Sequence, residues 1–305
     1  MSFSVTILGS SSALPASNRN LPAHLLNVDE RFFLIDCGEG TQLQLRKYKA
    51  KFSRLDHIFI THLHGDHTFG LPGLISSFNL LGRKNDLHIY ANADLEKILN
   101  QFLSHFFTRL DFSIVYHPLN VSAPELLYEN KKITVHSFPL KHRVPTCGFV
   151  FREKPRLRYI RKDMIDYYKI PVKEIVNIKN GDDFMTEQGL VISNALITND
   201  PEPAKSYAFC SDTGYTEKIV SYIKEVDLLY HEATYSDEDI ERAKKHFHSS
   251  ASEAAAIAKL ANVGRLIIGH FSARYKDIAP LVEQARKIFP NTDAAEDGMV
   301  ITIQD

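Results

Sequence analysis

Three histidines and one aspartate lie within six positions of the stretch THLHGDH, residues 61–67. They are His62, His64, Asp66 and His67, and they directly follow the apolar run IFI, which is typical of a buried strand. Imidazole nitrogens and carboxylate oxygens are natural ligands of zinc where no thiolate is nearby. In a turn, this spacing lets His62 and His64 face one metal ion while Asp66 and His67 face a second. The stretch therefore predicts half of a two-metal site.

Four side chains cannot complete two metal shells, so further ligands must come from other strand ends, where sites in α/β proteins gather. Three coordinating residues each directly follow an apolar run: His142, Asp212 and His270. A single histidine at a strand end is more often a surface or hydrogen-bonded residue, so the local pattern alone leaves these three open. The histidines without this context are interpreted as structural or surface residues: His24, His57, His88, His105, His117, His136, His231 and His246.

The overall composition is that of a globular protein with an ordinary core. The chain has 305 residues, 44% hydrophobic and 24% charged, which fits one large α/β domain or two small ones. The formal net charge of −1 gives no argument for a nucleic-acid partner, so any such argument must be local. No run of eighteen apolar residues predicts a membrane span. The first ten residues carry no basic region typical of a signal peptide, and three isolated cysteines form no disulfide framework. We therefore expect a cytoplasmic location.

Predicted strands and helices alternate along the chain, with hairpins mixed in. The apolar patterns predict strands at 3–8, 55–62, 87–91, 112–119, 133–142, 148–153, 190–197, 206–213, 226–234, 265–271 and 299–303. A hairpin with a turn at 29–31 precedes a helix for which Thr41 is the expected N-cap, and helical spacing recurs at 70–82, 94–107, 249–261 and 277–289. The mixture favours an α/β fold in which helices cover packed sheets, rather than a purely parallel doubly wound sheet.

The HLHGDH stretch resembles the signature of the metallo-β-lactamase superfamily. That resemblance implies an αβ/βα sandwich of two mixed sheets covered by helices, with a two-metal site at one edge. It also supports the three open ligand candidates, which fall in the order of the superfamily's later motifs. Carried over by motif, His62, His64 and His142 hold one zinc ion, Asp66, His67 and His270 hold the other, and Asp212 bridges the two.

Longer stretches resemble one family within that superfamily, ribonuclease Z in its short bacterial form. They are LGSSSALPASNRN, DCGEGTQLQL, THLHGDHTFGLPGL, YHEATY, HFSARY and AEDGMVITI, and they run from residue 8 to residue 303. The resemblance implies one domain over 1–305 that acts as a zinc-dependent endoribonuclease and removes 3′ trailers from precursor tRNA. It implies a tRNA 3′-hydroxyl and a trailer 5′-phosphate as products, two zinc ions per subunit and a homodimer. Ligands of this kind also tolerate Mn²⁺ or Fe²⁺.

The resemblance also assigns roles in proton transfer. Two metal ions about 3.5–4 Å apart stabilise the attacking and leaving oxygens of a phosphodiester displacement. By family motif, Asp66 is a proton acceptor as well as a ligand, and His248 protonates the leaving ribose oxygen while Glu232 orients it. Locally, His248 also fits a residue that begins a helix beside the capping serines Ser249 and Ser250, and His246 is close enough to take its place.

A basic and aromatic segment at about 152–183 is the expected substrate-binding arm. From 141 to 173 the chain has ten lysines or arginines against three acidic residues, with tyrosines interleaved. Such a surface suits RNA, although a solvated charged helix fits the same pattern. In ribonuclease Z this position carries a protruding arm that grips the tRNA elbow. Here Pro171 and the run IKNG match the arm motif, but its Gly-Pro pair is missing. The candidate phosphate contacts are Arg143, Arg156, Arg158, Arg161, Lys162 and, outside the arm, Arg274.

Two other functions are compatible with parts of the pattern. A hydrolase of small phosphodiesters or sulfate esters would use the same metal ligands, and the altered arm motif is the feature that favours it. A metal-free RNA-binding scaffold would need only the basic segment, but the full set of seven ligand candidates argues against it.

Overall fold

The computed structural model describes residues 3–15, 19–106 and 109–303. These residues form two compact units. The first, called the main unit here, comprises 3–152 and 205–303, and the second, the inserted unit, comprises Glu153–Ala204. Each unit has its own hydrophobic core.

The first sheet of the main unit has seven strands in the order β18-β1-β2-β3-β4-β5-β6. Their bounds are β18 (Val300–Thr302), β1 (Phe3–Gly9), β2 (Ala23–Val28), β3 (Arg31–Ile35), β4 (Leu55–Phe59), β5 (Leu87–Ala91) and β6 (Ile114–Pro118). Pairing is antiparallel from β18 to β3 and parallel from β3 to β6. The carboxyl ends of β3 and β4 therefore lie at the same edge of this sheet.

The second sheet also has seven strands, in the order β17-β16-β15-β14-β9-β8-β7. Their bounds are β17 (Thr292–Ala294), β16 (Arg265–Gly269), β15 (Leu228–Glu232), β14 (Ser206–Cys210), β9 (Cys147–Glu153), β8 (Ile133–Pro139) and β7 (Glu125–Glu129). The four strands from β14 to β17 are parallel, and β9 is antiparallel to β14. Parallel pairing places the carboxyl ends of β14, β15 and β16 at one edge.

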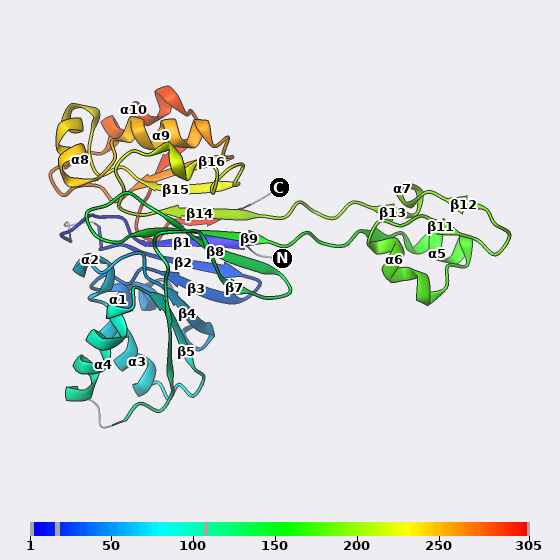
Figure 1. Cartoon of the computed structure of the whole chain (residues 1–305), viewed down its shortest axis with the longest axis horizontal. Helices are drawn as coiled ribbons and strands as arrows, with labels where there is room; N and C mark the ends of the chain where they lie inside the picture. The colour runs from blue at the N-terminus through cyan, green and yellow to red at the C-terminus, as the bar shows by residue number, and fades with distance from the viewer. Residues whose placement is uncertain (1–2, 16–18, 107–108, 304–305) are drawn as a thin grey trace. The chain divides into compact units, whose positions relative to one another are not determined.

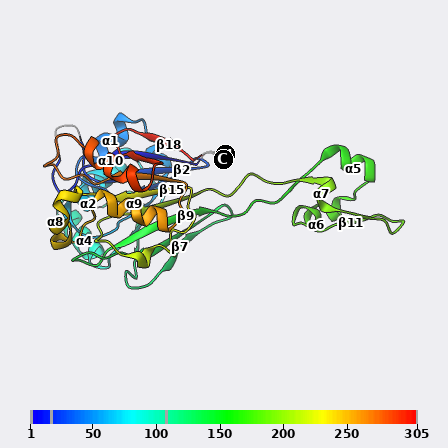
Figure 2. The ribbon, with the colours of Figure 1, turned by 90° about the horizontal axis from the view of Figure 1, so that it is seen from above.

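The two sheets pack face to face between two layers of helices (Figures 1 and 2). Side chains from both sheets form the central core, among them Phe3 and Phe33 from the first sheet and Phe149 and Tyr207 from the second. The first sheet is covered by α1 (Thr41–Lys47), α3 (Leu71–Leu80) and α4 (Asp94–Phe106), and α2 (Gly65–Thr68) follows β4. The second sheet is covered by α9 (Ala251–Leu260) and α10 (Ala279–Ile288), with α8 (Ile240–His246) before them. None of the described helices is long and apolar enough to cross a membrane.

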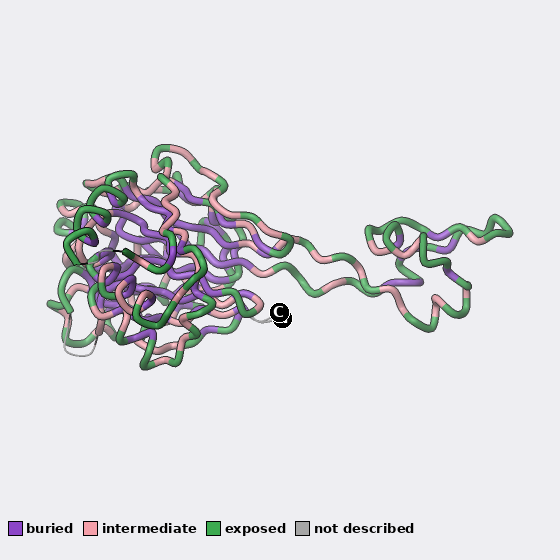
Figure 3. Tube along the Cα trace, turned by 90° about the horizontal axis from the view of Figure 1, so that it is seen from below, coloured by how far each residue is buried: buried purple, intermediate pink, exposed green. Residues whose placement is uncertain are grey.

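This arrangement is the predicted αβ/βα sandwich with two mixed sheets. Figure 3 shows the buried segments gathered in the interior of the main unit, and strands such as β1, β9, β14 and β15 are mostly buried. The predicted hairpin turns at Asp29 and Glu30, both with positive φ. Thr41 is not the N-cap of α1, because Gly40 takes that position at a φ of 84°. The Thr41 hydroxyl instead donates to the carbonyl oxygen of Gly38, within the loop that follows β3.

The inserted unit consists of short elements around a small apolar core. They are β10 (Tyr159–Ile160), α5 (Lys162–Tyr168), α6 (Ile175–Lys179), β11 (Phe184–Met185), β12 (Val191–Ile192), α7 (Asn194–Ile197) and β13 (Thr198–Asn199). The single strand predicted over 190–197 is wrong, since this segment divides into β12 and α7. The reason is that Asn194 turns inward, where its side-chain amide donates to the carbonyl oxygens of Ile178 and Asp182. The unit ends at Ala204, beyond the expected limit near 183.

Candidate metal centre

Asp212 lies at the centre of a cluster in which strand ends of both sheets meet. It follows β14 and is 2% exposed. One carboxylate oxygen, Oδ2, lies 3.7 Å from Nε2 of His62 and 3.9 Å from Nε2 of His142. The other, Oδ1, lies 3.3 Å from Nε2 of His67 and 3.2 Å from Nε2 of His270. The two oxygens of Asp212 thus face two different pairs of histidines.

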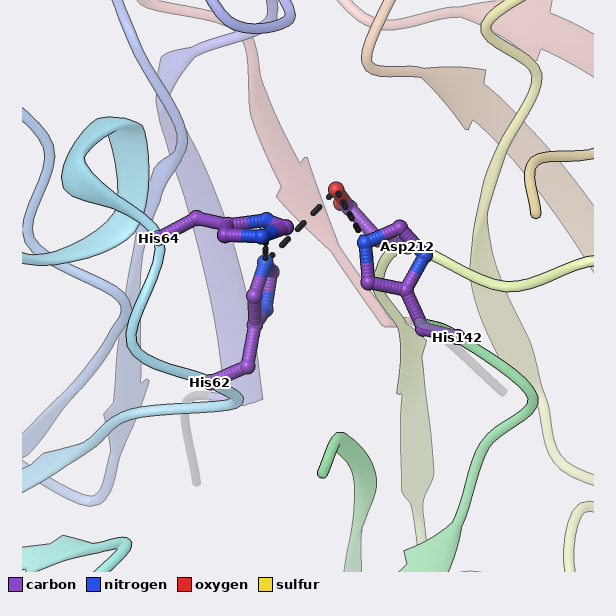
Figure 4. Close-up of side chains that lie close together, drawn as sticks. All are labelled: His62, His64, His142 and Asp212. Atoms are coloured by element: carbon purple, nitrogen blue, oxygen red, sulfur yellow. Dashed lines mark hydrogen bonds and ion pairs between the residues drawn. The ribbon is translucent and has the colours of Figure 1, made fainter. Parts of the chain in front are cut away.

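The seven candidate ligands form two groups around this carboxylate. Ligand atoms of His62, His64, His142 and Asp212 all lie within 4.8 Å of one another, and Figure 4 shows these side chains pointing toward a common space. Ligand atoms of Asp66, His67 and His270 satisfy the same limit. Within the first group, Nδ1 of His64 lies 2.9 Å from Nε2 of His62. The structure therefore brings together every residue that the strand-end pattern proposed.

Three imidazole nitrogens in this centre are buried and have no hydrogen-bond partner among the described residues. They are the Nε2 atoms of His67, His142 and His270. In each ring the opposite nitrogen, Nδ1, is engaged: with Asp36 at 2.8 Å in His67, with the carbonyl oxygen of Phe247 at 2.9 Å in His142, and with Thr234 in His270. Buried polar atoms are nearly always satisfied, and an imidazole that donates through Nδ1 presents the Nε2 lone pair to a cation. The residues therefore fit bound metal ions.

The electrostatics of the centre also suit cations. Burial by itself would raise the pKa of Asp212, but His270, His67 and His62 around it hold that pKa well below its ordinary value. Burial likewise opposes the charge of His67, yet the carboxylates of Asp212, Asp36 and Asp66 raise the pKa of this histidine well above its ordinary value. Ionised carboxylates of this kind supply the negative charge that divalent metal ions need.

Asp66 is the most exposed side chain of the second group, at 12%. Its Oδ2 accepts a hydrogen bond from the backbone N–H of Ala13 at 2.9 Å and lies 3.7 Å from Nε2 of His270. Burial opposes ionisation, but the neighbouring His67 keeps the pKa of Asp66 below its ordinary value. The loop after β1 thus contributes a backbone donor to the site.

Asp36 and Glu232 are two fully buried carboxylates that contact histidines of the centre and its surroundings. Asp36, after β3, accepts from Nδ1 of His67 and, at 2.8 Å, from the backbone N–H of Thr61. Glu232, the last residue of β15, lies 2.8 Å from Nδ1 of His248. Burial raises the pKa of Asp36, and the contacts with His67 and Thr61 act against this rise. Metal-binding histidines are commonly oriented by such outer carboxylates.

His248 lies beside the metal centre, with its Nδ1 held by Glu232. Its ring centroid is 5.2 Å from that of His142 and 5.5 Å from that of His270. Burial alone would lower its pKa, but Glu232 offsets this effect and raises the pKa of His248 to about 9. Since Nδ1 is engaged by Glu232, Nε2 is the nitrogen that can exchange a proton. His246 lies at the end of α8, where its ring stacks on Tyr235.

The backbone of the centre is itself unusual at two positions. Asp36 and His270 have φ angles of 56° and 59°, a region that residues other than glycine rarely adopt. The start of α3 is packed tightly against the loop that follows Asp36, because a Cβ added at Gly70 would lie 2.1 Å from the carbonyl oxygen of Gly38. Such conformations persist only where the surrounding structure holds them in place.

The candidate substrate contacts of the main unit lie outside this centre. Arg143 is exposed in the segment that follows His142. Arg274 is exposed, with its guanidinium 3.3 Å from Asp239 and 5.5 Å from the ring centroid of Tyr235. Arg274 is therefore engaged in an ion pair and in a cation–π contact within the protein.

The candidate arginines of the inserted unit are paired with acidic side chains. Arg156 contacts Glu153 and Glu202, Arg158 forms an ion pair with Asp200, and Arg161 contacts Asp163. Lys162 is exposed on the first turn of α5. Within Glu153–Ala204 there are eight lysines or arginines and nine acidic residues. The basic character of 141–173 is thus balanced within the folded unit by acidic residues from its second half.

Four supporting groups were missed by sequence reasoning: Asp36, Thr61, Thr234 and the backbone N–H of Ala13. Asp36 and Thr234 lie inside the quoted stretches DCGEGTQLQL and YHEATY, and Thr61 directly precedes His62. A carboxylate or hydroxyl at the end of a predicted strand was a signal that could have found three of them. The Ala13 contact depends on how a loop folds back onto Asp66, and no local pattern indicates it.

Comparison with known proteins identifies the family. Residues 3–164 match a family model described as Anti-Pycsar protein Apyc1. A protein of Bacteroides thetaiotaomicron named Ribonuclease Z is 49% identical over 303 residues, covering 99% of this chain and 96% of that protein. A Ribonuclease Z of Porphyromonas gingivalis is 45% identical over 301 residues, covering 99% of each chain.

Solved structures agree with these relatives. Human tRNase Z, short form (ELAC1), is 29% identical with a TM-score of 0.72, covering 99% of this chain and 100% of that chain. The metallo-beta-lactamase fold protein YhfI from Bacillus subtilis is 19% identical with a TM-score of 0.69, covering the same shares, and this likeness concerns the fold alone. The predicted fold is confirmed. The chain belongs to the ribonuclease Z family of metallo-β-lactamase-fold proteins, and its residues 3–164 also fall within the family described as Anti-Pycsar protein Apyc1.

Proposed function

We propose that this chain is a metal-dependent endoribonuclease that removes 3′ trailers from precursor tRNA. The observation that carries the proposal is the 45–49% identity to proteins named Ribonuclease Z over nearly the whole chain. The cluster of histidines and aspartates around Asp212 supports it, because phosphodiester cleavage is a common use of two adjacent metal ions. The products would be a tRNA that ends in a 3′-hydroxyl and a trailer that begins with a 5′-phosphate.

We assign the metal ligands from the geometry of the two groups. One ion would be held by His62, His64 and His142, and the other would be held by Asp66, His67 and His270. Asp212 would contact both ions. When bound, the ions would polarise the phosphodiester and activate water for attack. Zinc suits this donor set, and Mn²⁺ or Fe²⁺ are the alternatives to be compared. Two metal equivalents per purified chain would exclude a metal-free RNA-binding scaffold.

The reaction breaks the bond between phosphorus and the ribose 3′-oxygen. Water attacks phosphorus, and Asp66 accepts the proton that the water loses. His248 donates a proton from Nε2 to the departing 3′-oxygen, and Glu232 holds the ring of His248 through Nδ1. The contact with Glu232 raises the pKa of His248 and so favours the protonated ring that a general acid requires.

We propose that the inserted unit binds the tRNA, while the main unit holds the metal centre. Exposed Tyr159 and Tyr167 provide stacking surfaces, and exposed lysines such as Lys162 provide phosphate contacts. The pairing of Arg156, Arg158 and Arg161 with acidic side chains reduces the number of cations available there. We therefore expect binding that rests more on stacking and shape than on a strongly basic surface.

We also propose that the chain forms a homodimer in the cytoplasm. Leu80, at the end of α3, is 82% exposed, and Leu43 and Leu81 are exposed as well, which makes this end of the helical layer a candidate interface. The three cysteines are buried and unpaired, which is consistent with a reducing compartment. A monomeric mass by light scattering would contradict the dimer.

The experiment that tests the proposed function is a mapped cleavage assay. A precursor tRNA with a 3′ trailer is incubated with the protein, with and without a chelator, and a His64→Ala variant serves as a control for the metal centre. Chelator-sensitive cleavage directly after the discriminator nucleotide supports the proposal. Intact precursor, together with hydrolysis of a small phosphodiester, would instead favour the second candidate, a small-phosphodiester hydrolase. The charge balance of the inserted unit is the observation that favours that candidate.

A further inference from the structure

We propose that Thr234 is a positioning residue that fixes the protonation pattern of His270. In this proposal the Thr234 hydroxyl donates its proton to the buried Glu232 carboxylate and accepts a hydrogen bond from Nδ1–H of His270. The proton of the His270 ring therefore stays on Nδ1, and the lone pair on Nε2 remains directed at the metal centre. The inference rests on the metal-dependent function proposed above, and it concerns the side chain that prepares one ligand before any metal or RNA binds.

Glu232 is surrounded by donors. Its side chain is 0% exposed, and an ionised carboxylate can only accept hydrogen bonds. Oε1 accepts from the backbone N–H groups of Thr213 (3.0 Å) and Ser249 (3.1 Å) and lies 2.8 Å from Nδ1 of His248. Oε2 accepts from the backbone N–H (2.9 Å) and from the hydroxyl (2.7 Å) of Thr234. The three backbone donors fix the carboxylate in place, so its acceptor role toward Thr234 is determined.

The single hydroxyl proton of Thr234 is therefore committed to Glu232. The oxygen of that hydroxyl then offers only lone pairs to its other neighbours. Nδ1 of His270 lies 2.9 Å away, so it must be the protonated nitrogen of its ring if the contact is to be a hydrogen bond. Nδ1 of His248 lies farther from the hydroxyl, at 3.3 Å, and has a closer acceptor in Glu232.

The consequence for His270 is a lone pair on Nε2. That atom is buried without a hydrogen-bond partner among the described residues, 3.2 Å from Oδ1 of Asp212 and 3.7 Å from Oδ2 of Asp66. Without the Thr234 acceptor, the ring could move its proton to Nε2, where these two carboxylate oxygens would accept it. A proton on Nε2 blocks coordination, so the Thr234 hydroxyl favours the tautomer that is able to bind metal.

Thr61 holds a comparable position on the other sheet, but its geometry is less decisive. Its hydroxyl lies 3.0 Å from both oxygens of Asp36 and 3.0 Å from Nδ1 of His62. The hydroxyl of Ser211 lies 3.2 Å away and offers a further acceptor for the same proton. The contacts therefore determine which atom donates and which accepts at Thr234, but not at Thr61.

The test compares Thr234→Val, which keeps the side-chain shape without the hydroxyl, with Thr234→Ser, which keeps the hydroxyl. Thr292→Val is the matched control, because Thr292, the first residue of β17, is also buried and its hydroxyl donates to the carbonyl oxygen of Phe289 at the end of α10. Long-range ¹H–¹⁵N NMR of the metal-free proteins reports the tautomer of His270, assigned by its absence in His270→Gln. Zinc affinity is then measured by competition with a chelating dye.

We expect the wild type, T234S and T292V to show Nδ1–H in His270, and T234V to show a shift toward Nε2–H. Zinc affinity should fall about 10- to 100-fold in T234V, as is typical when a partner of a ligand histidine is removed, and T234S should restore it. An unchanged tautomer and affinity in T234V would overturn the proposal, and so would equal losses in T234V and T234S. Should T234V fail to fold, T234A takes its place with the same expected outcomes. Neither measurement uses RNA, so failure of the precursor to be cleaved would refute the proposed function without affecting this result.

Discussion

Replacing His248 by alanine should slow cleavage of precursor tRNA much more than cleavage of an activated phosphodiester. The ribose 3′-oxygen leaves as a poor alkoxide unless a proton reaches it, whereas a nitrophenolate leaves without one. His248 is 15% exposed, and Glu232 engages its Nδ1, so Nε2 is the atom that can deliver the proton. The loss of cleavage rate in H248A should therefore be larger for a leaving group that needs a proton than for one that does not.

The expected size of the effect follows from the role. General acid catalysis contributes about 100- to 10,000-fold to a rate, which corresponds to about 3–5 kcal/mol of barrier. Under single-turnover conditions, the rate constant for cleavage of precursor tRNA should be lower by that factor in H248A. On bis(p-nitrophenyl) phosphate the loss should stay within about threefold, since no proton transfer to the leaving group is needed. His246→Ala, which alters the neighbouring histidine at the end of α8, should leave both rates nearly unchanged.

Metal content separates this effect from damage to the centre. His248 forms a possible ligand group with Asp212 and His270, so each variant must retain the wild-type metal content for the comparison to hold. Equal losses on both substrates would refute the reasoning, because they would indicate that His248 supports the metal centre rather than protonating the leaving oxygen.

Changes at Glu232, at the bound metal ions, at Arg156 and at the buried cysteines should each have a measurable effect. The cleavage rate should fall as pH rises through the pKa of His248, because the ring then loses the proton that it donates. Glu232→Gln should move this fall in rate to lower pH, because it removes the carboxylate that raises the pKa of His248 to about 9. Since bound cations lower this pKa in both enzymes, the shift is measured as the difference between the two pH–rate profiles. Chelation should abolish cleavage and lower the melting temperature measured by calorimetry, since ions bound to the folded state stabilise it, and added Zn²⁺ should restore both. Arg156→Ala should destabilise the inserted unit by about 1–3 kcal/mol through loss of the contacts with Glu153 and Glu202, seen as faster hydrogen exchange in α5 and α6, whereas Lys162→Ala should not. Cys37, Cys147 and Cys210 should resist alkylation in the folded protein near neutral pH, because burial raises the pKa of each thiol.

Much of the architecture could be predicted from the sequence because its signals are local. Apolar runs that end in coordinating residues marked β4, β14 and β16, and the spacing in THLHGDH placed four candidate ligands on one turn. Helical spacing identified α3, α4, α9 and α10 in the same way. The inserted unit was harder to predict, since a segment such as 190–197 contains apolar residues that suit either a strand or a helix. Its outcome depends on contacts of Asn194 with a distant turn.

Residue types and their short spacing were enough to identify the side chains that could bind metal, because ligand chemistry is local. How these side chains meet depends on the folded chain. Asp212 faces two histidine pairs because the parallel strands of both sheets end at a shared edge, and those pairs lie up to about 200 positions apart along the chain. The supporting carboxylates Asp36 and Glu232, and the hydroxyl of Thr234, gain their roles from burial and from donors supplied by other segments. Contacts of this kind leave no local pattern, since the chain must first fold to place a donor opposite each acceptor.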